Sequence, residues 1–211
     1  MDSTAKKTEQ LTPLQKAIIA LKDARAKIEA LEKKNHEPIA IIGMGCRFPG
    51  GSNSPEAFWE LLRQGKDGIT TVPSQRWDID AYYAEDADAP NKMYARYGGF
   101  IEEVDRFDPQ FFGITPREAI ALDPQQRLLL EVSWSALENA GIAPQKLTGS
   151  KTGVFMGIGI DDYAKRQIKH QIPIDAYTGS GNGFCFASGR LSYLLGLQGP
   201  SLSIDTACST S

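Results

Sequence analysis

The sequence predicts an α/β fold, because short continuous apolar runs alternate with helical patterns along most of the chain. The segments expected to form strands cover residues 39–42, which are a continuous apolar run, 152–157 and 200–205. The helical patterns cover residues 54–64, 123–141 and 184–195. Apolar runs without polar alternation are typical of strands that are covered on both faces. We therefore expect helices on both sides of the sheet.

The helix expected to begin near Asp123 has the clearest signals. Asp123 can cap the helix, Pro124 suits its first turn, and Gly141 ends it. Its apolar positions predict one face toward the core: Leu128, Leu129, Val132, Leu137 and Ala140. By contrast, residues 65–99 show no regular pattern and are expected to be mostly irregular.

A separate helix is expected over residues 12–34. Thr12 and Gln15 can form a capping box around Pro13. Apolar residues then recur with the a and d spacing of a heptad: Leu14, Ala17, Leu21, Ala24, Ile28 and Leu31. Two interpretations remain open: an amphipathic helix packed on its own domain, or a short coiled coil or docking helix for another chain. Both predict a boundary between an N-terminal helix with its linker, residues 1–36, and an α/β domain, residues 37–211.

Composition excludes several classes of protein. Hydrophobic residues make up 41% and charged residues 23% of the 211 residues, as in ordinary globular proteins. Residues 1–37 carry a net charge of +2 and the rest −5, so a nucleic-acid partner is not expected. The sequence has neither a membrane-spanning apolar run nor a signal peptide. We expect a cytoplasmic protein.

Most of the motif-like residues have an ordinary structural interpretation. Gly43 and Gly45 follow an apolar run, but Phe48 stands where a dinucleotide-binding loop needs a third glycine. The cysteines are not paired with metal-site spacing, so no metal or cofactor is expected. Cys46 and Cys185 are expected to be small buried hydrophobic residues. The two histidines are expected in a linker (His36) and on the surface (His170).

Cys208 is the exception, because it follows a predicted buried strand, lies among small residues and is expected to precede a helix. A thiol at such a turn lies near the positive end of the helix dipole, which favours the thiolate. Small neighbours would let a thioester approach, and the backbone N–H of Cys208 could stabilise an oxyanion. From this pattern alone, a catalytic thiol and a buried structural cysteine both remain open.

Five blocks, in order, resemble the ketosynthase domains of modular type I polyketide synthases. The blocks cover residues 37–51 (EPIAIIGMGCRFPGG), 111–119 (FFGITPREA), 122–131 (LDPQQRLLLE), 199–205 (GPSLSID) and 205–211 (DTACSTS). The last block resembles the active-site motif of that family and contains Cys208. The resemblance implies a thiolase-like layered αβαβα fold that works as a homodimer. This chain would supply most of the first half only, preceded by the amphipathic N-terminal helix.

The resemblance also implies a chemistry. In this family the cysteine accepts an acyl chain from the phosphopantetheine thiol of an upstream acyl or peptidyl carrier protein. A malonyl-type extender on the module's own carrier protein then loses CO₂, and its carbanion attacks the acyl group. Cys208 matches the nucleophile, and phosphopantetheine would belong to the partners, with no cofactor bound by this domain. The two histidines and the lysine that the family uses lie downstream of its cysteine, so we expect this chain alone to be inactive.

Two other functions remain open at this point. The first is a non-catalytic ketosynthase-like protein that acts by dimerisation, although such proteins usually lack the cysteine. The second is a docking module whose working part is residues 1–36, similar to segments that precede ketosynthases and bind an upstream carrier protein.

Overall fold

The computed structural model describes residues 12–35 and 38–210. The chain separates into two compact units, residues 1–41 and residues 42–211, and each is described by itself. Among the described residues, no helix combines the length and the apolar character needed to cross a membrane.

The first unit contains one long helix, α1 (Pro13–Asn35). The predicted capping box is present: Gln15 N–H donates to Thr12 Oγ1 (3.3 Å), and Thr12 N–H donates to Gln15 Oε1 (2.8 Å). The large side chains of the heptad positions are exposed on α1: Leu14, Leu21, Ile28 and Leu31. Whether this row of side chains binds a partner stays a prediction.

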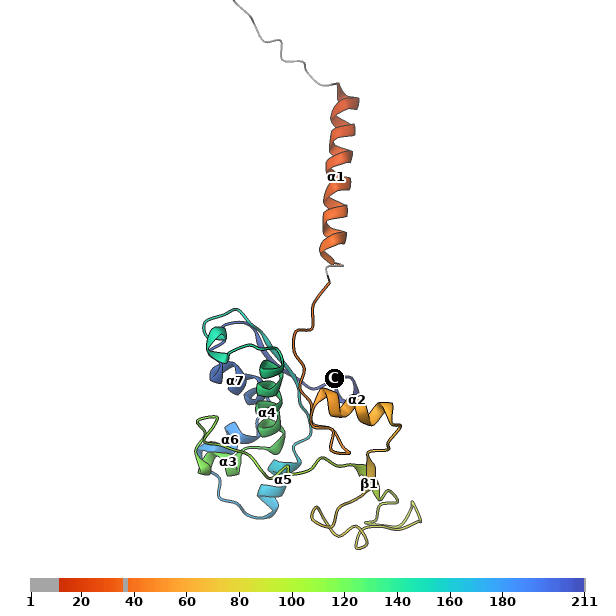
Figure 1. Cartoon of the computed structure of the whole chain (residues 1–211), viewed down its shortest axis with the longest axis vertical. Coiled ribbons are helices and arrows are strands. Elements are labelled where there is room, and N and C mark those ends of the chain that lie inside the picture. The colour runs from red at the N-terminus through yellow and green to blue at the C-terminus, as the bar shows by residue number, and fades with distance from the viewer. Residues whose placement is uncertain (1–11, 36–37, 211) are drawn as a thin grey trace, which may run out of the picture. The chain divides into compact units, whose positions relative to one another are not determined.

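The second unit holds all the strands of the described chain (Figure 1). Its α-helices are α2 (Pro55–Arg63), α3 (Pro116–Ala121), α4 (Pro124–Asn139), α5 (Asp162–Lys169), α6 (Ala176–Asn182) and α7 (Cys185–Leu194). Its strands are β1 (Ile69–Thr71), β2 (Tyr97–Gly99), β3 (Val154–Gly157) and β4 (Ser201–Ile204). Two short 3₁₀ helices complete it, η1 (Pro144–Leu147) and η2 (Ala207–Ser209). The predicted helices near 54, 123 and 184 and the predicted strands near 152 and 200 are confirmed.

The strands form two small sheets. β1 and β2 pair antiparallel, with Ile69 opposite Gly99, within the region expected to be mostly irregular. β3 and β4 pair parallel, with Val154 opposite Ser201 and Gly157 opposite Ile204. A parallel pair needs a long crossover connection, and residues 158–200, with α5, α6 and α7, provide it.

The parallel sheet is covered on one face only. Val154 and Met156 point inward and are buried, whereas Phe155 points outward and is 64% exposed. Leu202, which pairs with Phe155 on the same outer face, is 48% exposed. The expectation that both faces are buried is therefore wrong for the described residues: helices pack on the inner face, whereas Phe155 and Leu202 on the outer face stay exposed.

The hydrophobic core lies between the inner face of β3 and the helices α4 and α7, which lie side by side in Figure 1. Leu122 and Leu130 are its most deeply buried large side chains. The apolar face expected for α4 is half-buried, and Leu130 and Gln126 are its buried residues instead. Gln126 is accommodated because its side-chain amide donates to the carbonyl oxygens of Gly181 (3.0 Å) and Gly183 (3.3 Å).

The strand expected over residues 39–42 is not formed. This segment is extended but unpaired in the described chain, and Ile39 and Ile42 are exposed. A strand exists only where a neighbour accepts its hydrogen bonds, and none of the described strands does so here. The following residues instead pack on α4: a Cβ atom on Gly45 would lie 2.6 Å from the Val132 carbonyl oxygen.

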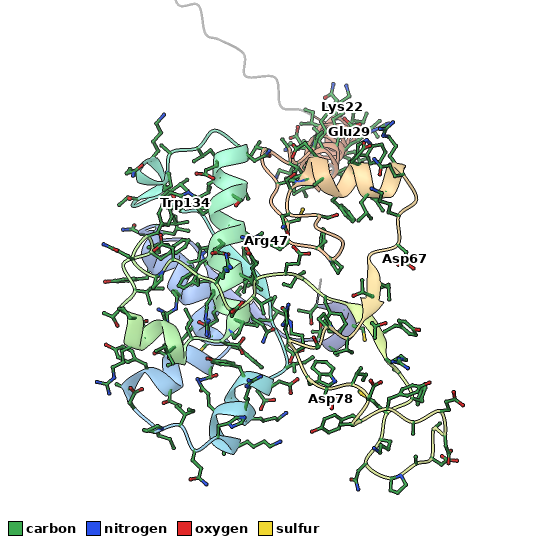
Figure 2. All side chains as sticks on the ribbon, turned by 60° about the horizontal axis from the view of Figure 1, so that its bottom comes forward. Lys22, Glu29, Arg47, Asp67, Asp78 and Trp134 are labelled. Carbon is green, nitrogen blue, oxygen red and sulfur yellow. The ribbon has the colours of Figure 1, made fainter. Side chains whose placement is uncertain are left out.

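Arg47 ties the residues around it to α4. Its guanidinium donates to Glu131 Oε2 at 3.2 Å, and Figure 2 shows Arg47 beside the α4 ribbon. Trp134, also labelled in Figure 2, packs edge-on against Phe111 with ring centroids 4.7 Å apart. These contacts hold the segments on both sides of α4 against the helix.

Candidate functional site

The candidate site lies where β3 and β4 end. Because the strands are parallel, their carboxyl ends meet at the same edge of the sheet, the edge at which α/β proteins place their functional groups. Ile158 extends the pairing beyond β3, since its N–H donates to the Ile204 carbonyl oxygen (3.1 Å). The residues that follow β4, 205–210, therefore begin directly beside residues 157–159.

A tight turn carries Cys208 away from this edge. Asp205 Oδ1 accepts a hydrogen bond from Ala207 N–H (3.0 Å), and Ala207 adopts a left-handed conformation with φ of 54°. Side-chain hydrogen bonds to a residue two positions on are typical of aspartate at the start of a turn. Residues Ala207–Ser209 then form η2, and Cys208 is its central residue.

The far end of the turn is closed by side-chain hydroxyl groups. Thr206 N–H donates to Thr210 Oγ1 at 2.8 Å, and Ser209 Oγ donates to the Thr206 carbonyl oxygen at 3.0 Å. The nucleophile candidate is thus held between two local hydrogen-bond systems, one from Asp205 and one from Thr210. The helix expected beyond Cys208 is untested, because the described residues stop at Thr210.

The Cys208 side chain is exposed, so a bulky thioester could reach its sulfur. The described residues include no acceptor for its backbone N–H, which leaves that donor free for an incoming oxygen. An accessible thiol with an adjacent free N–H is the minimum arrangement for covalent acyl transfer.

A pair of serines, Ser203 half-buried on β4 and Ser188 buried on α7, joins the strand to the helix. Ser203 on β4 donates through Oγ to Ser188 Oγ on α7 (2.9 Å), and Ser188 N–H donates to Ser203 Oγ (3.3 Å). Ser188 is almost completely buried. The strand that leads into the Cys208 turn is therefore tied to the helix that packs beneath it.

The other cysteines and the histidines lie apart from this turn in sequence. Cys46 is half-buried, and burial together with the Glu56 carboxylate raises the pKa of its thiol. Cys185 is exposed, which corrects the prediction that it is a buried hydrophobic residue: it begins α7, a helix whose buried side chains are Ala187, Ser188 and Leu191. His170 is exposed at the end of α5, as predicted. His36 lies outside the described residues.

Two pockets of the second unit lie elsewhere. One pocket of about 880 Å³ is lined by Arg76, Phe100, Arg127 and Tyr163, among others. Another, of about 640 Å³, lies among α3, α5 and α6 and is lined by Ile120, Ile168 and Ile174. Neither includes Cys208 in its lining. In the part of the chain that the structure describes, no cluster of three or more metal-binding side chains is found.

Sequence reasoning proposed the thiol as a candidate but missed the residues that support its turn. Asp205 and Thr210 lie in the same motif as Cys208, and Gly157 and Gly159 lie opposite them at the end of β3. A signal for the glycines exists in the sequence, because Gly157 is the last residue of a predicted strand and Gly159 follows two positions later. Glycine at such a position indicates that another part of the backbone approaches closely.

The fold and the site define a protein with an accessible thiol on a tight turn at the carboxyl end of a parallel sheet. The chain belongs to the β-ketoacyl synthase family: the family model described as the N-terminal domain of β-ketoacyl synthase matches residues 36–211. This result confirms the resemblance seen in the five sequence blocks.

Relatives with curated descriptions are polyketide synthases. The chain is 50% identical over 211 residues to one of the phenolphthiocerol/phthiocerol polyketide synthase proteins of Mycobacterium tuberculosis (strain CDC 1551 / Oshkosh). It is 51% identical over 175 residues, 83% of its length, to a second protein of the same synthase and strain. The chain spans only 12% of the length of the first relative and 11% of the second.

Solved structures of similar fold are ketosynthase domains. The oxazolomycin ketosynthase domain OzmH KS7 of Streptomyces albus JA3453 matches with a TM-score of 0.72 and 34% identity. That match covers 81% of this chain and 29% of the other. The ketosynthase from module 6 of the bacillaene synthase of Bacillus subtilis 168, in a cysteine-to-serine mutant form, matches with a TM-score of 0.71 and 35% identity. It covers 82% of this chain and 27% of that one.

Proposed function

We propose that this chain is part of a polyketide synthase ketosynthase in which Cys208 accepts the acyl chain. The observation that carries the proposal is the exposed thiol on the turn directly after β4, within a chain of the β-ketoacyl synthase family. The 50% identity to a polyketide synthase protein supports the substrate class, a thioester carried by a partner protein.

The first half-reaction is a thioester exchange. The Cys208 thiolate attacks the carbonyl carbon of an acyl group held on the phosphopantetheine thiol of an upstream carrier protein. The negative charge develops on the carbonyl oxygen, where the Cys208 backbone N–H can donate to it. The phosphopantetheine thiolate then leaves and takes up a proton, and the acyl group remains on the cysteine sulfur. Phosphopantetheine is thus supplied by partners, and the domain itself holds no cofactor.

The second half-reaction is a decarboxylative Claisen condensation. A malonyl-type group on the module's own carrier protein loses CO₂, and the electron pair of the broken C–C bond forms an enolate. Its carbon attacks the acyl-cysteine carbonyl, the bond to sulfur breaks, and the Cys208 thiolate is regenerated. An enolate needs positioned donors, and the 211 residues contain only His36 and His170 as histidines. His170 is exposed at the end of α5. We therefore propose that these 211 residues alone do not condense.

The test of the nucleophile is acyl loading in the complete synthase of which we propose this chain is a part. Loading from an acyl carrier protein should be detected by intact-protein mass spectrometry as one added acyl group. Replacing Cys208 by alanine should abolish the added mass, whereas the Cys185→Ala control, which removes another exposed thiol, should load normally. Full loading or full condensation by the Cys208→Ala protein would rule out this proposal.

The outer face of the parallel sheet supports the association of two copies. Phe155 and Leu202 are exposed side by side there, and contiguous apolar surface is typical of interfaces. We propose that the intact ketosynthase has a layered αβαβα fold and is a homodimer. A Phe155→Asp variant that stays dimeric in analytical ultracentrifugation would contradict a dimer role for this face.

A second function, docking, is supported by α1. Its heptad side chains Leu14, Leu21, Ile28 and Leu31 are exposed along a helix of 23 residues, and most helical stability in proteins comes from the packing of an apolar face. We propose that α1 binds the end of an upstream synthase chain and brings its carrier protein close. Deletion of residues 1–36 should slow loading from the upstream carrier protein but not from a small acyl thioester. Docking would be excluded if the deletion slowed both loading reactions equally, or if it slowed neither of them.

A further inference from the structure

We propose that Gly157 and Gly159 are positioning residues for the Cys208 nucleophile, because their bare backbone lets the Cys208 turn close over the end of β3. This inference rests on the proposed role of Cys208 in acyl loading. It adds two residues, about 50 positions earlier in the chain, to the groups that place the reacting sulfur.

Gly157 faces Thr210 on the outer side of the sheet. A Cβ atom on Gly157 would lie 2.5 Å from Thr210 Cγ2 and 2.9 Å from the Thr210 carbonyl oxygen. Cβ contacts below 3.0 Å are essentially never seen, so a side chain at position 157 must displace Thr210. Thr210 cannot simply rotate away, because its Oγ1 accepts the Thr206 N–H that closes the turn.

Gly159 faces the other end of the same turn. A Cβ atom there would lie 2.9 Å from Asp205 Oδ2 and 3.1 Å from Oδ1. The Asp205 carboxylate is in use, since Oδ1 accepts the Ala207 N–H. That hydrogen bond holds Ala207 in its left-handed conformation, which is unfavourable for a residue with a side chain. Moving Asp205 would therefore release the residue directly before Cys208.

The two glycines thus lie against Thr210 and Asp205, the residues whose side chains hold the two ends of the turn, and not against Cys208 itself. Neither glycine has the positive φ that would by itself require glycine, so close approach is the reason for the residue type at both positions. A displacement of about 1 Å at a reacting centre can cost about 10²-fold in rate. We therefore expect substitutions here to act on the rate of acylation and to leave substrate binding nearly unchanged.

The main test is single-turnover acylation of Cys208 in the complete synthase with a small acyl thioester. Gly157→Ala should lower the maximal acylation rate about 10²-fold, with the half-saturating thioester concentration unchanged within about twofold. Gly189→Ala is the matched control, because a Cβ atom there meets nothing within 4 Å, and it should acylate like the parent protein. Acylation of Gly157→Ala at the parent rate would overturn the inference.

A rescue separates positioning from a general loss of stability. Thr210→Ser removes the methyl group that a new side chain at position 157 would strike, and it keeps the hydroxyl group that accepts from Thr206. The double variant Gly157→Ala/Thr210→Ser should be acylated at least about tenfold faster than Gly157→Ala. Absence of any recovery would overturn the role given to the Thr210 methyl group, since only the contact with the Thr210 carbonyl oxygen (2.9 Å) remains in the double variant.

A pair of variants at Thr210 tests the hydrogen bond from Thr206 N–H to the Thr210 hydroxyl group, without adding a side chain to β3. Thr210→Val keeps the shape of the side chain but loses the acceptor for Thr206 N–H, and it should slow acylation about tenfold. Thr210→Ser should stay within about twofold of the parent rate. Equal rates for the serine and valine variants would count against the inference. Cys208→Ala, measured alongside, reports on the proposed function separately: continued loading by that variant refutes the nucleophile itself.

Discussion

Glu118 on α3 and Arg190 on α7 form an ion pair whose side chains are only 19% and 15% exposed. The pair joins two segments that are 72 residues apart in the sequence. Arg190 also donates to the Ser180 carbonyl oxygen at 3.4 Å, so it links α3, α6 and α7. Of these helices, α7 packs directly on β3 and β4.

Removing one member of this pair should destabilise the fold strongly, because the other charge stays buried without a partner. We expect Glu118→Ala and Arg190→Ala each to lower the free energy of unfolding by about 3–5 kcal/mol. The double variant should lose less than the sum of the two. Urea denaturation measures all three. The control is Arg63→Ala, which breaks an exposed pair with Glu60 on α2 and should barely move the midpoint. An equally small effect at Arg190 would contradict this prediction.

Two glycines of α6 should respond in opposite ways to alanine. A Cβ atom on Gly181 would collide with the backbone carbonyl of Ala121, whereas one on Gly179 meets nothing within 4 Å. Crowding a packed backbone costs about 1–3 kcal/mol, so Gly181→Ala should lower stability by that amount. Gly179→Ala should stabilise by about 0.5–1 kcal/mol, because alanine is the better helix former. Urea midpoints of the two variants, compared with the parent, would refute this prediction if they shifted equally.

The Glu131 carboxyl should make stability fall as pH rises. Burial raises the pKa of Glu131 above its ordinary value of 4.5, and this outweighs the opposite effect of the Arg47 guanidinium. The unfolded chain then loses this proton at a lower pH than the folded chain does. Between these two pKa values of Glu131, the folded chain binds more protons than the unfolded chain. The contribution of Glu131 to stability is therefore greatest below its pKa in the unfolded chain and is lost as the pH rises to its pKa in the folded chain.

Replacing Glu131 by glutamine should remove that part of the pH dependence. Replacing Arg47 by methionine should raise the pKa of Glu131 further and extend the decrease in stability to higher pH. Urea midpoints between pH 4 and pH 8 measure both effects. A Glu131→Gln variant that loses more stability relative to the parent as pH rises would show that the sign is wrong.

The sequence predicted the elements whose signals are local. α4 has a capping residue, a proline in its first turn and a final glycine. β3 is a short apolar run, and in β4 serine alternates with apolar residues. α5 and α6 were missed because their sequences are polar or rich in glycine, and tertiary contacts hold them. One such contact is the hydrogen bond from Asn182 Nδ2 to Gln167 Oε1 (2.9 Å).

What depends on distant residues could not be predicted. The segment 39–42 has the composition of a strand, but pairing is decided by a neighbour and not by the run itself. At the candidate site, the motif around Cys208 was the reason to choose its thiol as the candidate nucleophile, and that role stays a prediction. The contact between Gly157 and Thr210 spans 53 positions and follows only from the parallel register of β3 and β4.

The three cysteines should differ in their rates of alkylation in the folded chain. The Cys46 thiol is half-buried and donates to the Ser52 carbonyl oxygen (3.8 Å), and its pKa is raised by burial and by Glu56. Because the thiolate is the reactive form, Cys46 should be labelled after Cys185 and Cys208, which are both exposed. Iodoacetamide at neutral pH, followed by peptide mass spectrometry, measures the order.

Two further conditions separate the causes at Cys46. Glu56→Gln removes the nearby negative charge, so it should lower the pKa of Cys46 and speed its alkylation, although burial keeps it slower than the exposed thiols. Unfolding in urea removes burial as well and should bring the three rates close together. Labelling of Cys46 ahead of Cys208 in the folded chain would contradict the packing of residues 46–52. It would also make thiol trapping unsuitable as a probe of the candidate nucleophile.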